Sequence, residues 1–438
     1  QAQLARLSQD FSWFSPVLKR QLEGKRGDIG VRPRTEDEIR AVVAGCARRG
    51  LPITVRGSGT GNYGQIVPLQ GGLILDMGAC NAFGWAKAGA GRAQSGIRLG
   101  DFDRAAQPSG WELRWLPSTF RSATLGGLYG GGFGGVGSIN HGPLASPGNV
   151  LGVRALTLEP EPQAVELRAP EALLLHHVYG TNGVVVELEV ALAPAHPWRE
   201  AIASFDDFDA AIAFADTLAL APGIVKKSVT LLAQPVPDLL LQATPWLAGH
   251  LQPGTHAVLL LVAEWAEPAL LQLLQAAGGR LTMNRGATEV GDSNRTLVEY
   301  TWNHTTLHAL KVDKTLTYIQ SSFQPGRQVE QAKALRAHFG DEVPLHLEWI
   351  RNRDGLMTCS GLQLVRFSTE ARLAEIMQIH RDHGVGINNP HAFIVEDGKQ
   401  QRVNPDAVAM KARFDPQGLL NPGKLRGWDE RPLLPAAA

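Results

Sequence analysis

Glycines at a spacing typical of anion-binding loops are the first feature of this sequence that predicts chemistry. Gly59, Gly61 and Gly64 satisfy the GxGxxG pattern of dinucleotide-binding turns. In a Rossmann fold the last glycine begins a helix, but residues 65–72 here contain a proline and two further glycines, which prevent one. The acidic partner expected about 20 residues later is missing, because Asp76 is too near. These features disfavour a Rossmann site for a nicotinamide dinucleotide, which we keep as an alternative.

The same glycines can bind an anion without a helix. Backbone N–H groups of residues 57–64 can converge on a pyrophosphate in a nest. A second glycine-rich stretch, residues 126–142, carries nine glycines in seventeen residues, a density that disfavours helix and strand interiors. Apolar side chains are interleaved there, and a solvated linker would not carry them. We therefore expect an ordered coil, and two such loops predict a dinucleotide held by backbone groups from both sides.

Acid–base side chains are expected from the second half of the chain, because the glycine loops offer only backbone donors. Alternation along residues 344–351 places apolar side chains on one strand face and His346 and Glu348 on the other. If the apolar face packs on helices, His346 and Glu348 point either to solvent or toward the ligand. His391 and His304 are further candidates for proton transfer, since each lies among polar and aromatic neighbours. A structural hydrogen bond is the alternative for each histidine.

The sequence gives little support for metal chemistry. His346 and Glu348 would supply two ligands without an evident third, so we expect no metal. Cys46, Cys80 and Cys359 are scattered and lack CxxC spacing, which excludes an iron–sulfur cluster bound by this chain alone and a disulfide framework. Such cysteine usage is typical of a reducing cytoplasm, where we expect the protein.

Length and charge restrict the class of partner. A chain of 438 residues with 44% hydrophobic residues exceeds what one core usually holds, so two domains are expected. The 42 basic and 42 acidic residues balance, and no polybasic run points to nucleic acid or an anionic membrane. No apolar run approaches the ~20 residues that a spanning helix needs. A small-molecule substrate fits best.

The patterns of apolar residues predict an α+β protein. Thr35 and Glu38 form a capping box for a helix that ends before Gly50, and β-rich runs follow at 52–55, 73–75, 150–158 and 184–192. Pro194 and Pro197 mark a boundary, after which strands and helices alternate. We expect one antiparallel sheet with helices on one face, with strands at 228–232, 257–263, 316–319, 344–350 and 362–367 and helices at 208–218, 269–277, 329–339 and 373–380.

Several motifs resemble the vanillyl-alcohol oxidase / p-cresol methylhydroxylase (PCMH) superfamily of FAD enzymes. Residues 56–64 resemble its pyrophosphate loop, residues 123–127 its TxGG segment, and residues 415–424 its C-terminal DPxxxLNPGK. Matches at 141–152 and 180–185 lie between them in the family's order. The resemblance implies that FAD is held by Arg56, Gly57, Ser58, Gly59, Thr60, Gly61, Asn62, Gly64, Gln65, Pro117, Ser122, Thr124, Leu125, Gly126, Gly127, Gly131, His141, Val150, Val184, Val185, Asn421 and Lys424.

The resemblance also implies an organisation into three segments. They are a PCMH-type FAD-binding domain at 1–195, a substrate cap at 196–385, and a return to the flavin at 386–438. Members that tether the flavin use a histidine where Thr60 stands or a cysteine where Phe120 stands, so we predict non-covalent FAD. Residues 382–386 resemble the EHGxG of the D-2-hydroxy-acid dehydrogenase branch, but the metal-binding HxGDGNxH of that branch is missing, which weakens this assignment.

These observations predict a FAD-dependent oxidoreductase that takes a hydride from a CH–OH or CH–NH group of a small alcohol, 2-hydroxy acid or similar substrate. Oxygen, a quinone or a carrier protein would accept the electrons, and a homodimer is compatible with the sequence. The alternative is a flavin-binding subunit of a larger electron-transfer complex, without substrate chemistry of its own. The strand at 344–350 and the C-terminal return are expected to supply the catalytic side chains.

Overall fold

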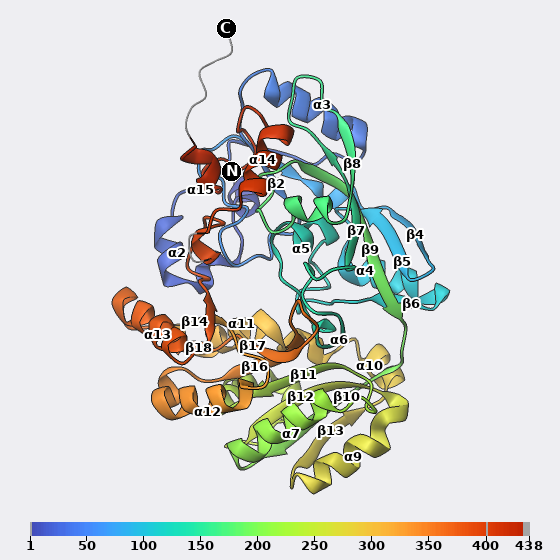
Figure 1. The fold of residues 1–438 in the computed structure, drawn as a ribbon, viewed down its shortest axis with the longest axis vertical. Coiled ribbons are helices and arrows are strands. Elements are labelled where there is room, and N and C mark those ends of the chain that lie inside the picture. Colours follow the sequence, from blue (N-terminus) through green and yellow to red (C-terminus); the bar gives the residue numbers. More distant parts are fainter. Residues whose placement is uncertain (1, 400–401, 432–438) are drawn as a thin grey trace.

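The chain contains two large antiparallel sheets, one in an N-terminal lobe and one in a cap. In Figure 1 the N-terminal lobe is at the top and the cap is at the bottom. This computed structural model describes residues 2–399 and 402–431. The outer ends of the first and third expected segments, residue 1 and residues 432–438, lie outside the described residues, as do residues 400–401. The α+β class predicted from the sequence is confirmed.

The N-terminal lobe, residues 2–194, is built on two sheets. A parallel three-stranded sheet has the order β1-β3-β2, and a six-stranded antiparallel sheet has the order β4-β5-β9-β7-β8 with β6 on β9. The capping box predicted at Thr35 forms, because Thr35 Oγ1 accepts from the Glu38 N–H at 3.2 Å. The strands are β1 (Ile29–Val31), β2 (Ile53–Arg56), β3 (Leu73–Asp76), β4 (Phe83–Lys87), β5 (Ala90–Gln94), β6 (Trp111–Leu113), β7 (Val150–Leu156), β8 (Ala164–Arg168) and β9 (Val184–Pro194). The helices are α1 (Ala2–Leu7), α2 (Pro16–Gln21), α3 (Glu36–Ala47) and α4 (Leu99–Ala106).

The second glycine-rich stretch is not the coil that its composition predicts. It contains two short helices, α5 (Leu125–Gly131) and α6 (Ser138–His141). Thr124 caps α5 by accepting from the Gly127 N–H at 3.1 Å. Low intrinsic helix propensity is overridden here because the buried side chains Leu125, Leu128 and Tyr129 anchor α5 in the core.

The cap, residues 198–388, carries an eight-stranded sheet of order β13-β10-β12-β11-β16-β17-β15-β19. Its members are β10 (Trp198–Phe205), β11 (Lys226–Leu232), β12 (His256–Ala263), β13 (Arg280–Arg285), β15 (Gln320–Ser322), β16 (His346–Arg351), β17 (Met357–Gly361) and β19 (Gly386–Asn388). The expected strands at 316–319 and 362–367 do not join it: β14 (Leu316–Tyr318) and β18 (Leu364–Arg366) pair as a separate two-stranded sheet. Because β19 pairs with β15, we propose that the cap extends three residues past the expected boundary at 385.

Helices cover the cap sheet on its outer face and in part on its inner face. The outer helices are α7 (Phe208–Leu220), α9 (Glu267–Ala276), α12 (Gln328–Phe339) and α13 (Glu370–Asp382), whose apolar residues share one core with Val258, Leu260 and Val262 of β12. In Figure 1, α7, α9 and α12 lie below the sheet, away from the N-terminal lobe. Two helices that the sequence analysis missed, α8 (Val236–Ala243) and α11 (Trp302–Val312), share the opposite core with Leu259 and Leu261. A short helix, α10 (Ala287–Ser293), precedes α11.

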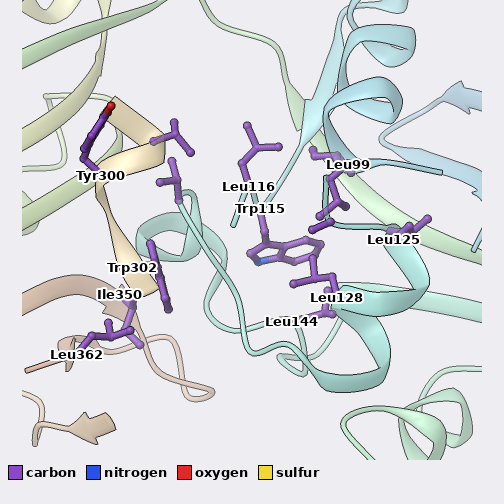
Figure 2. Close-up of a cluster of buried hydrophobic side chains, with 14 of the residues drawn as sticks. Leu99, Trp115, Leu116, Leu125, Leu128, Leu144, Tyr300, Trp302, Ile350 and Leu362 are labelled. Atoms are coloured by element: carbon purple, nitrogen blue, oxygen red, sulfur yellow. The ribbon is translucent and has the colours of Figure 1, made fainter. Parts of the chain in front are cut away.

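That opposite core continues from the cap into the N-terminal lobe. Figure 2 shows Trp115 above Leu128 of α5 in this view, with Leu125 to its right, and Trp302 and Ile350 of the cap belong to the same cluster. Shared burial of side chains from both lobes fixes the position of the cap relative to the glycine-rich stretch.

The C-terminal segment returns to the N-terminal lobe. Its helices, α14 (Pro405–Phe414) and α15 (Arg426–Asp429), lie beside the first strands at the top of Figure 1. The Ile53 N–H donates to Leu419 O at 2.8 Å, and the Asn421 N–H donates to Ile53 O at 2.7 Å. The segment thereby extends the sheet that ends at the first glycine loop.

Candidate functional site

A cavity of about 720 Å³ lies between the two lobes, within the size range of cofactor pockets. Its N-terminal wall consists of residues 57–66, residues 117–134 and residues 175–185 in part. Its cap wall comes from residues 302–307, 320–325, 350–362 and 388–389 in part. The two glycine loops, separated by more than fifty residues in the sequence, therefore face one space.

The floor of the cavity contains glycines that lie too close to neighbouring residues to carry a side chain. A Cβ on Gly57 would overlap Thr124 Oγ1, so the first loop contacts Thr124, the residue that caps the N-terminus of α5. A Cβ on Gly126 would lie 2.7 Å from Ser95 Cβ and 3.0 Å from Ser95 O. The first N–H groups of α5 already donate to Ile97 O, Ser95 O and Thr124 Oγ1. A pyrophosphate in this cavity would therefore be held mainly by backbone N–H groups of the first loop.

Many of the cofactor residues implied by the resemblance line this cavity. They are Gly57, Ser58, Gly59, Thr60, Gly61, Asn62, Gln65, Pro117, Thr124, Gly126, Gly127, Gly131 and Val185. Gln65 ties the two loops together, since its Nε2 donates to Gly131 O at 2.7 Å. The role of each residue in holding FAD stays a prediction.

Four further residues of that set support the first loop from behind without lining the cavity. Lys424 Nζ donates to Gly64 O at 2.7 Å, and burial lowers the pKa of this lysine to about 7. Asn421 Nδ2 donates at 2.7 Å to both Gln65 O and Tyr179 O. Arg56 Nη1 donates to Gly57 O at 2.9 Å. We therefore assign Arg56, Gly64, Asn421 and Lys424 a positioning role.

The remaining residues of the set also lie away from the cavity lining, which corrects the expectation of direct contact. The side chains of Leu125, Val150 and Val184 pack in the apolar cores. The carbonyl of Ser122 accepts from Ser58 Oγ. His141 faces a different pocket, and burial with nearby Arg114 lowers its pKa to about 4. Sequence alignment to motifs could not separate these cases, because contact depends on which way each side chain points.

The N-terminal end of α11 forms the cap wall opposite the glycines. Trp302, Asn303 and His304 all line the cavity, and Trp302 adopts a left-handed φ of 50°, which is rare for a bulky residue. Asn303 Nδ2 donates to Asn62 Oδ1 of the first loop at 3.1 Å, while the buried Asn303 Oδ1 has no partner among the described residues. His304 is the one of the four expected catalytic residues that reaches the cavity, and burial lowers its pKa to about 4.

His346 and Glu348 lie beneath this wall, not in it. Both are buried, and His346 Nε2 lies 2.8 Å from Glu348 Oε1. Glu348 also accepts from the Trp302 N–H at 2.7 Å and from Thr230 Oγ1 at 2.5 Å. The alternation predicted for this strand is right, since Leu347 and Trp349 pack against the outer helices. The expectation that the other face lines the site is wrong, because α11 covers it.

His391 is also placed differently from the expectation. Its Nδ1 lies 2.7 Å from Ser15 Oγ and its Nε2 lies 2.9 Å from Tyr318 O. The carbonyl can only accept, so Nε2 donates and Nδ1 accepts from the serine hydroxyl. Burial lowers the pKa of His391 to about 4, and the residue fits the alternative of a structural hydrogen bond.

Several cavity residues had no signal in the sequence analysis. Arg353, in the turn after β16, lines the cavity. Tyr63 donates its hydroxyl to Gln320 Oε1 at 2.6 Å across the lobes, and burial raises the pKa of Tyr63 to about 12. His177 and Tyr179 both adopt left-handed φ angles, 52° and 56°, in a turn whose N–H groups donate to the second glycine stretch. A polar residue in a turn carries no sequence pattern that marks it as a ligand contact.

The glycine floor and the cap wall fit FAD. The glycines form a cradle that side chains would fill, and the buried Oδ1 of Asn303, a residue that lines the cavity, has no hydrogen-bond partner among the described residues. Thr60 lines the cavity and Phe120 does not. Neither residue is the histidine or cysteine that tethers flavin in members of the family. Non-covalent binding stays a prediction.

Residues 2–399 and 402–431 contain no group of three or more His, Cys, Asp or Glu side chains arranged to hold a metal ion. Within the same residues, none of the helices has the length and apolar character needed to cross a bilayer.

Comparison with known proteins agrees with this geometry. Residues 28–161 match the family model of an FAD binding domain. Glycolate oxidase subunit GlcD of Escherichia coli is 25% identical over 425 residues, which span 90% of this chain and 82% of that protein. D-lactate dehydrogenase of Anaerostipes hadrus is 28% identical over 183 residues, 39% of this chain and 37% of that one. The solved structure of alkyldihydroxyacetonephosphate synthase superposes with a TM-score of 0.65 at 14% identity, over 91% of this chain and 76% of that chain. Residues 28–161 therefore form an FAD binding domain, and the relatives support an assignment of the chain to the FAD-binding oxidoreductase superfamily.

Proposed function

We propose that this FAD-dependent oxidoreductase oxidises the CH–OH group of a small 2-hydroxy acid. The observation that carries the proposal is the placement of Arg353 and His304 in one cavity with the glycine floor. One residue can bind a carboxylate and the other can accept a hydroxyl proton. When bound, FAD supplies the chemistry of hydride acceptance.

Arg353 gives the cavity its preference for an anionic substrate. Among the described lining residues, it is the one side chain with a permanent charge. A guanidinium can bind a carboxylate through two parallel N–H donors, which fixes orientation as well as affinity. A neutral alcohol or an amine could not form this ion pair, which supports the acid as the substrate.

His304 has the protonation state that a base needs. With a pKa lowered to about 4 by burial, its imidazole is neutral at pH 7 and can accept the proton of a substrate hydroxyl. Apolar side chains line this end of the cavity: the rings of Trp302 and Phe133 lie 6.4 Å apart, and Ile350 and Leu362 line the same wall. Figure 2 shows Trp302, Ile350 and Leu362 gathered there.

The names of two relatives support the choice of substrate class, since glycolate and D-lactate are 2-hydroxy acids. The same comparison supports one second candidate. Because the Escherichia coli relative is named as a subunit, this chain would in that case deliver electrons only within a larger complex. Oxygen, a quinone or a carrier protein remain the predicted electron acceptors.

Anaerobic reduction of the flavin tests the proposal without any acceptor. The purified protein, saturated with FAD, is mixed with glycolate, D-lactate, L-lactate, ethylene glycol or glycine while flavin absorbance is recorded. Bleaching by a hydroxy acid and not by the diol or the amine is expected. Bleaching by the diol or the amine alone would overturn the substrate class, and bleaching that requires a co-purifying protein would favour the subunit alternative.

The same preparation tests how FAD is held. Precipitation with acid should release the flavin into the supernatant, because neither Thr60 nor Phe120 can form the tether. Flavin that stays with the precipitated chain would refute non-covalent binding and leave the substrate proposal untouched.

A further inference from the structure

A second pocket, of about 340 Å³, lies where the chain passes from the N-terminal lobe into the cap. Its walls come from β6, the end of β9, the start of β10, the C-terminal end of α7, the start of β11 and α6. Arg351 and Met357, at the ends of β16 and β17, close it. It is separate from the large cavity, which the neighbouring residues Ile350 and Thr358 line from the other side of these strands.

The pocket carries an excess of positive charge. Arg114, Lys226, Lys227 and Arg351 line it, against one carboxylate, Glu112. That carboxylate is already occupied, because it accepts from Lys227 Nζ at 2.8 Å and from Trp198 Nε1 at 2.8 Å. Three cationic side chains are left without a carboxylate partner among the described residues.

Lys226 shows the imbalance most clearly. Only 6% of it is exposed, and the one partner to which its ammonium group donates among the described residues is the carbonyl of Ala221, just after α7. An ammonium has three donors, and a buried charge with so little compensation is costly. Burial, with the charge of Arg351, lowers the pKa of Lys226 to about 8.

The two arginines also have donors to spare. Arg114 donates to neutral oxygens of Leu192, Gly148 and Asn149 through Nε and Nη1. Arg351 donates to Gly355 O at 2.7 Å through Nη1. In each guanidinium the Nη2 group has no partner among the described residues, so both can bind an additional oxygen acceptor.

We propose that this pocket is a second binding site, for a small dianionic oxyanion such as a phosphate or a dicarboxylate, held by Lys226, Arg351 and Arg114. Arg114 belongs to the N-terminal lobe, and Lys226 and Arg351 belong to the cap. The anion therefore bridges the lobes at their covalent junction and neutralises the buried ammonium.

The site is tied to the glycine-rich stretch through α6. The Gly137 N–H donates to Lys227 O at 2.8 Å, and Asn140 Nδ2 donates to Lys226 O at 2.7 Å. Occupation of the pocket fixes β11 against the segment that continues into the cavity floor. The ligand is thus placed to stiffen the junction without entering the large cavity.

Calorimetric titration of the FAD-saturated Arg353→Gln protein tests the site, since bound FAD removes the glycine loops and the substitution removes the proposed substrate carboxylate site as competing anion sites. Inorganic phosphate and malonate are each titrated at pH 7.5 and constant ionic strength, with chloride as the reference salt. Saturable binding of at least one of them, at one site per chain, is expected. Arg351→Gln and Lys226→Met should each weaken it about tenfold or more, whereas the exposed Arg381→Gln on α13 should not.

Arg351 is exposed, so the Arg351→Gln variant tests the site even if Lys226→Met fails to fold. Selective binding of phosphate identifies a phosphate ligand, and selective binding of malonate identifies a dicarboxylate; both support the site. Heats no larger than those of chloride, or binding unchanged in Arg351→Gln, would overturn the proposal.

Discussion

His304 and Arg353 lie 49 positions apart in the chain and reach the same cavity from a helix and from a turn. At the scale of single residues, some side chains line the cavity, and others lie behind them and fix their positions through hydrogen bonds. Burial keeps the imidazole of His304 neutral, and the position of Arg353 in the turn after β16 lets its side chain reach the cavity. Neither property can be read from the residue type alone.

Replacing His304 by Gln should slow anaerobic flavin reduction by roughly two to four orders of magnitude, because the hydroxyl proton loses its acceptor. FAD should remain bound. Stopped-flow absorbance measures the rate, with the exposed His338→Gln on α12 as control. A rate equal to that of the unmodified protein would show that another group is the base.

Replacing Arg353 by Gln should raise the substrate concentration needed for half-maximal reduction about 10- to 100-fold, the loss of one charged hydrogen-bonding partner. Arg353→Lys should recover part of this loss. Since Arg353 is exposed, stability should not change. Equal affinity in the Gln and Arg forms would mean that the carboxylate is bound elsewhere.

At the scale of elements, the close contact between the glycine loops and their neighbours shapes the floor. Gly126 in α5 cannot carry a side chain without displacing Ser95. The helix therefore approaches β5 only because this position lacks a Cβ. The same reasoning explains why so glycine-rich a segment is ordered.

Gly126→Ala should weaken FAD binding, because the added Cβ pushes α5 from its place at a cost of roughly 1–3 kcal/mol. Fluorescence titration of the flavin-free protein measures the change. Gly291→Ala in α10 is a matched control, since nothing lies within 4 Å of a Cβ there. Unchanged affinity in Gly126→Ala would show that α5 does not contribute to the FAD site.

The start of α11 depends on Glu348, whose carboxylate holds the Trp302 N–H and Thr230 Oγ1. Glu348→Ala leaves these buried donors unpaired and should lower the free energy of unfolding by about 1–3 kcal/mol. Urea unfolding measures the loss, with the exposed Glu330→Ala as control. Glu348→Gln, which keeps an acceptor oxygen, should lose less, and no loss in Glu348→Ala would contradict the network.

At the scale of the whole molecule, buried histidines make stability depend on pH. Burial lowers the pKa of both His380 and His391 from 6.5 to about 4. Between these values the unfolded chain binds more protons than the folded one, so stability is full above pH 6.5 and falls as the pH drops toward 4. Asp10 and Glu200, whose pKa is raised by burial, act in the opposite sense at the acidic end.

His380→Phe should therefore flatten the loss of stability between pH 6.5 and 5, while keeping the packing against Phe339. Urea midpoints of the variant and the unmodified protein are compared at several pH values. The contribution of the carboxylates to the pH dependence is the same in both proteins and cancels in the difference. Parallel curves would show that His380 does not titrate differently on folding.

Local patterns were enough to predict the class of fold and a dinucleotide bound by the glycine loops, and the resemblance to a known family identified that dinucleotide as FAD. The capping box at Thr35 and the alternation through Leu347 and Trp349 depend on neighbours in the chain, and both form as expected. The two glycine-rich stretches line one cavity, although the second contains short helices and is not the expected coil. The comparisons confirm FAD and support the superfamily assignment. Such features are readable because backbone geometry and residue type act over a few positions.

Only the tertiary structure decided which polar side chains meet the ligand. His346 and Glu348 lie on the face expected to form the roof of the active site, yet α11 covers that face and Trp302 takes their place. His391 has the same residue type as His304 but is buried between Ser15 and Tyr318. Arg353 had no motif at all. Whether a side chain faces a cavity depends on the packing of segments that are far apart in the sequence, and no local pattern records that packing.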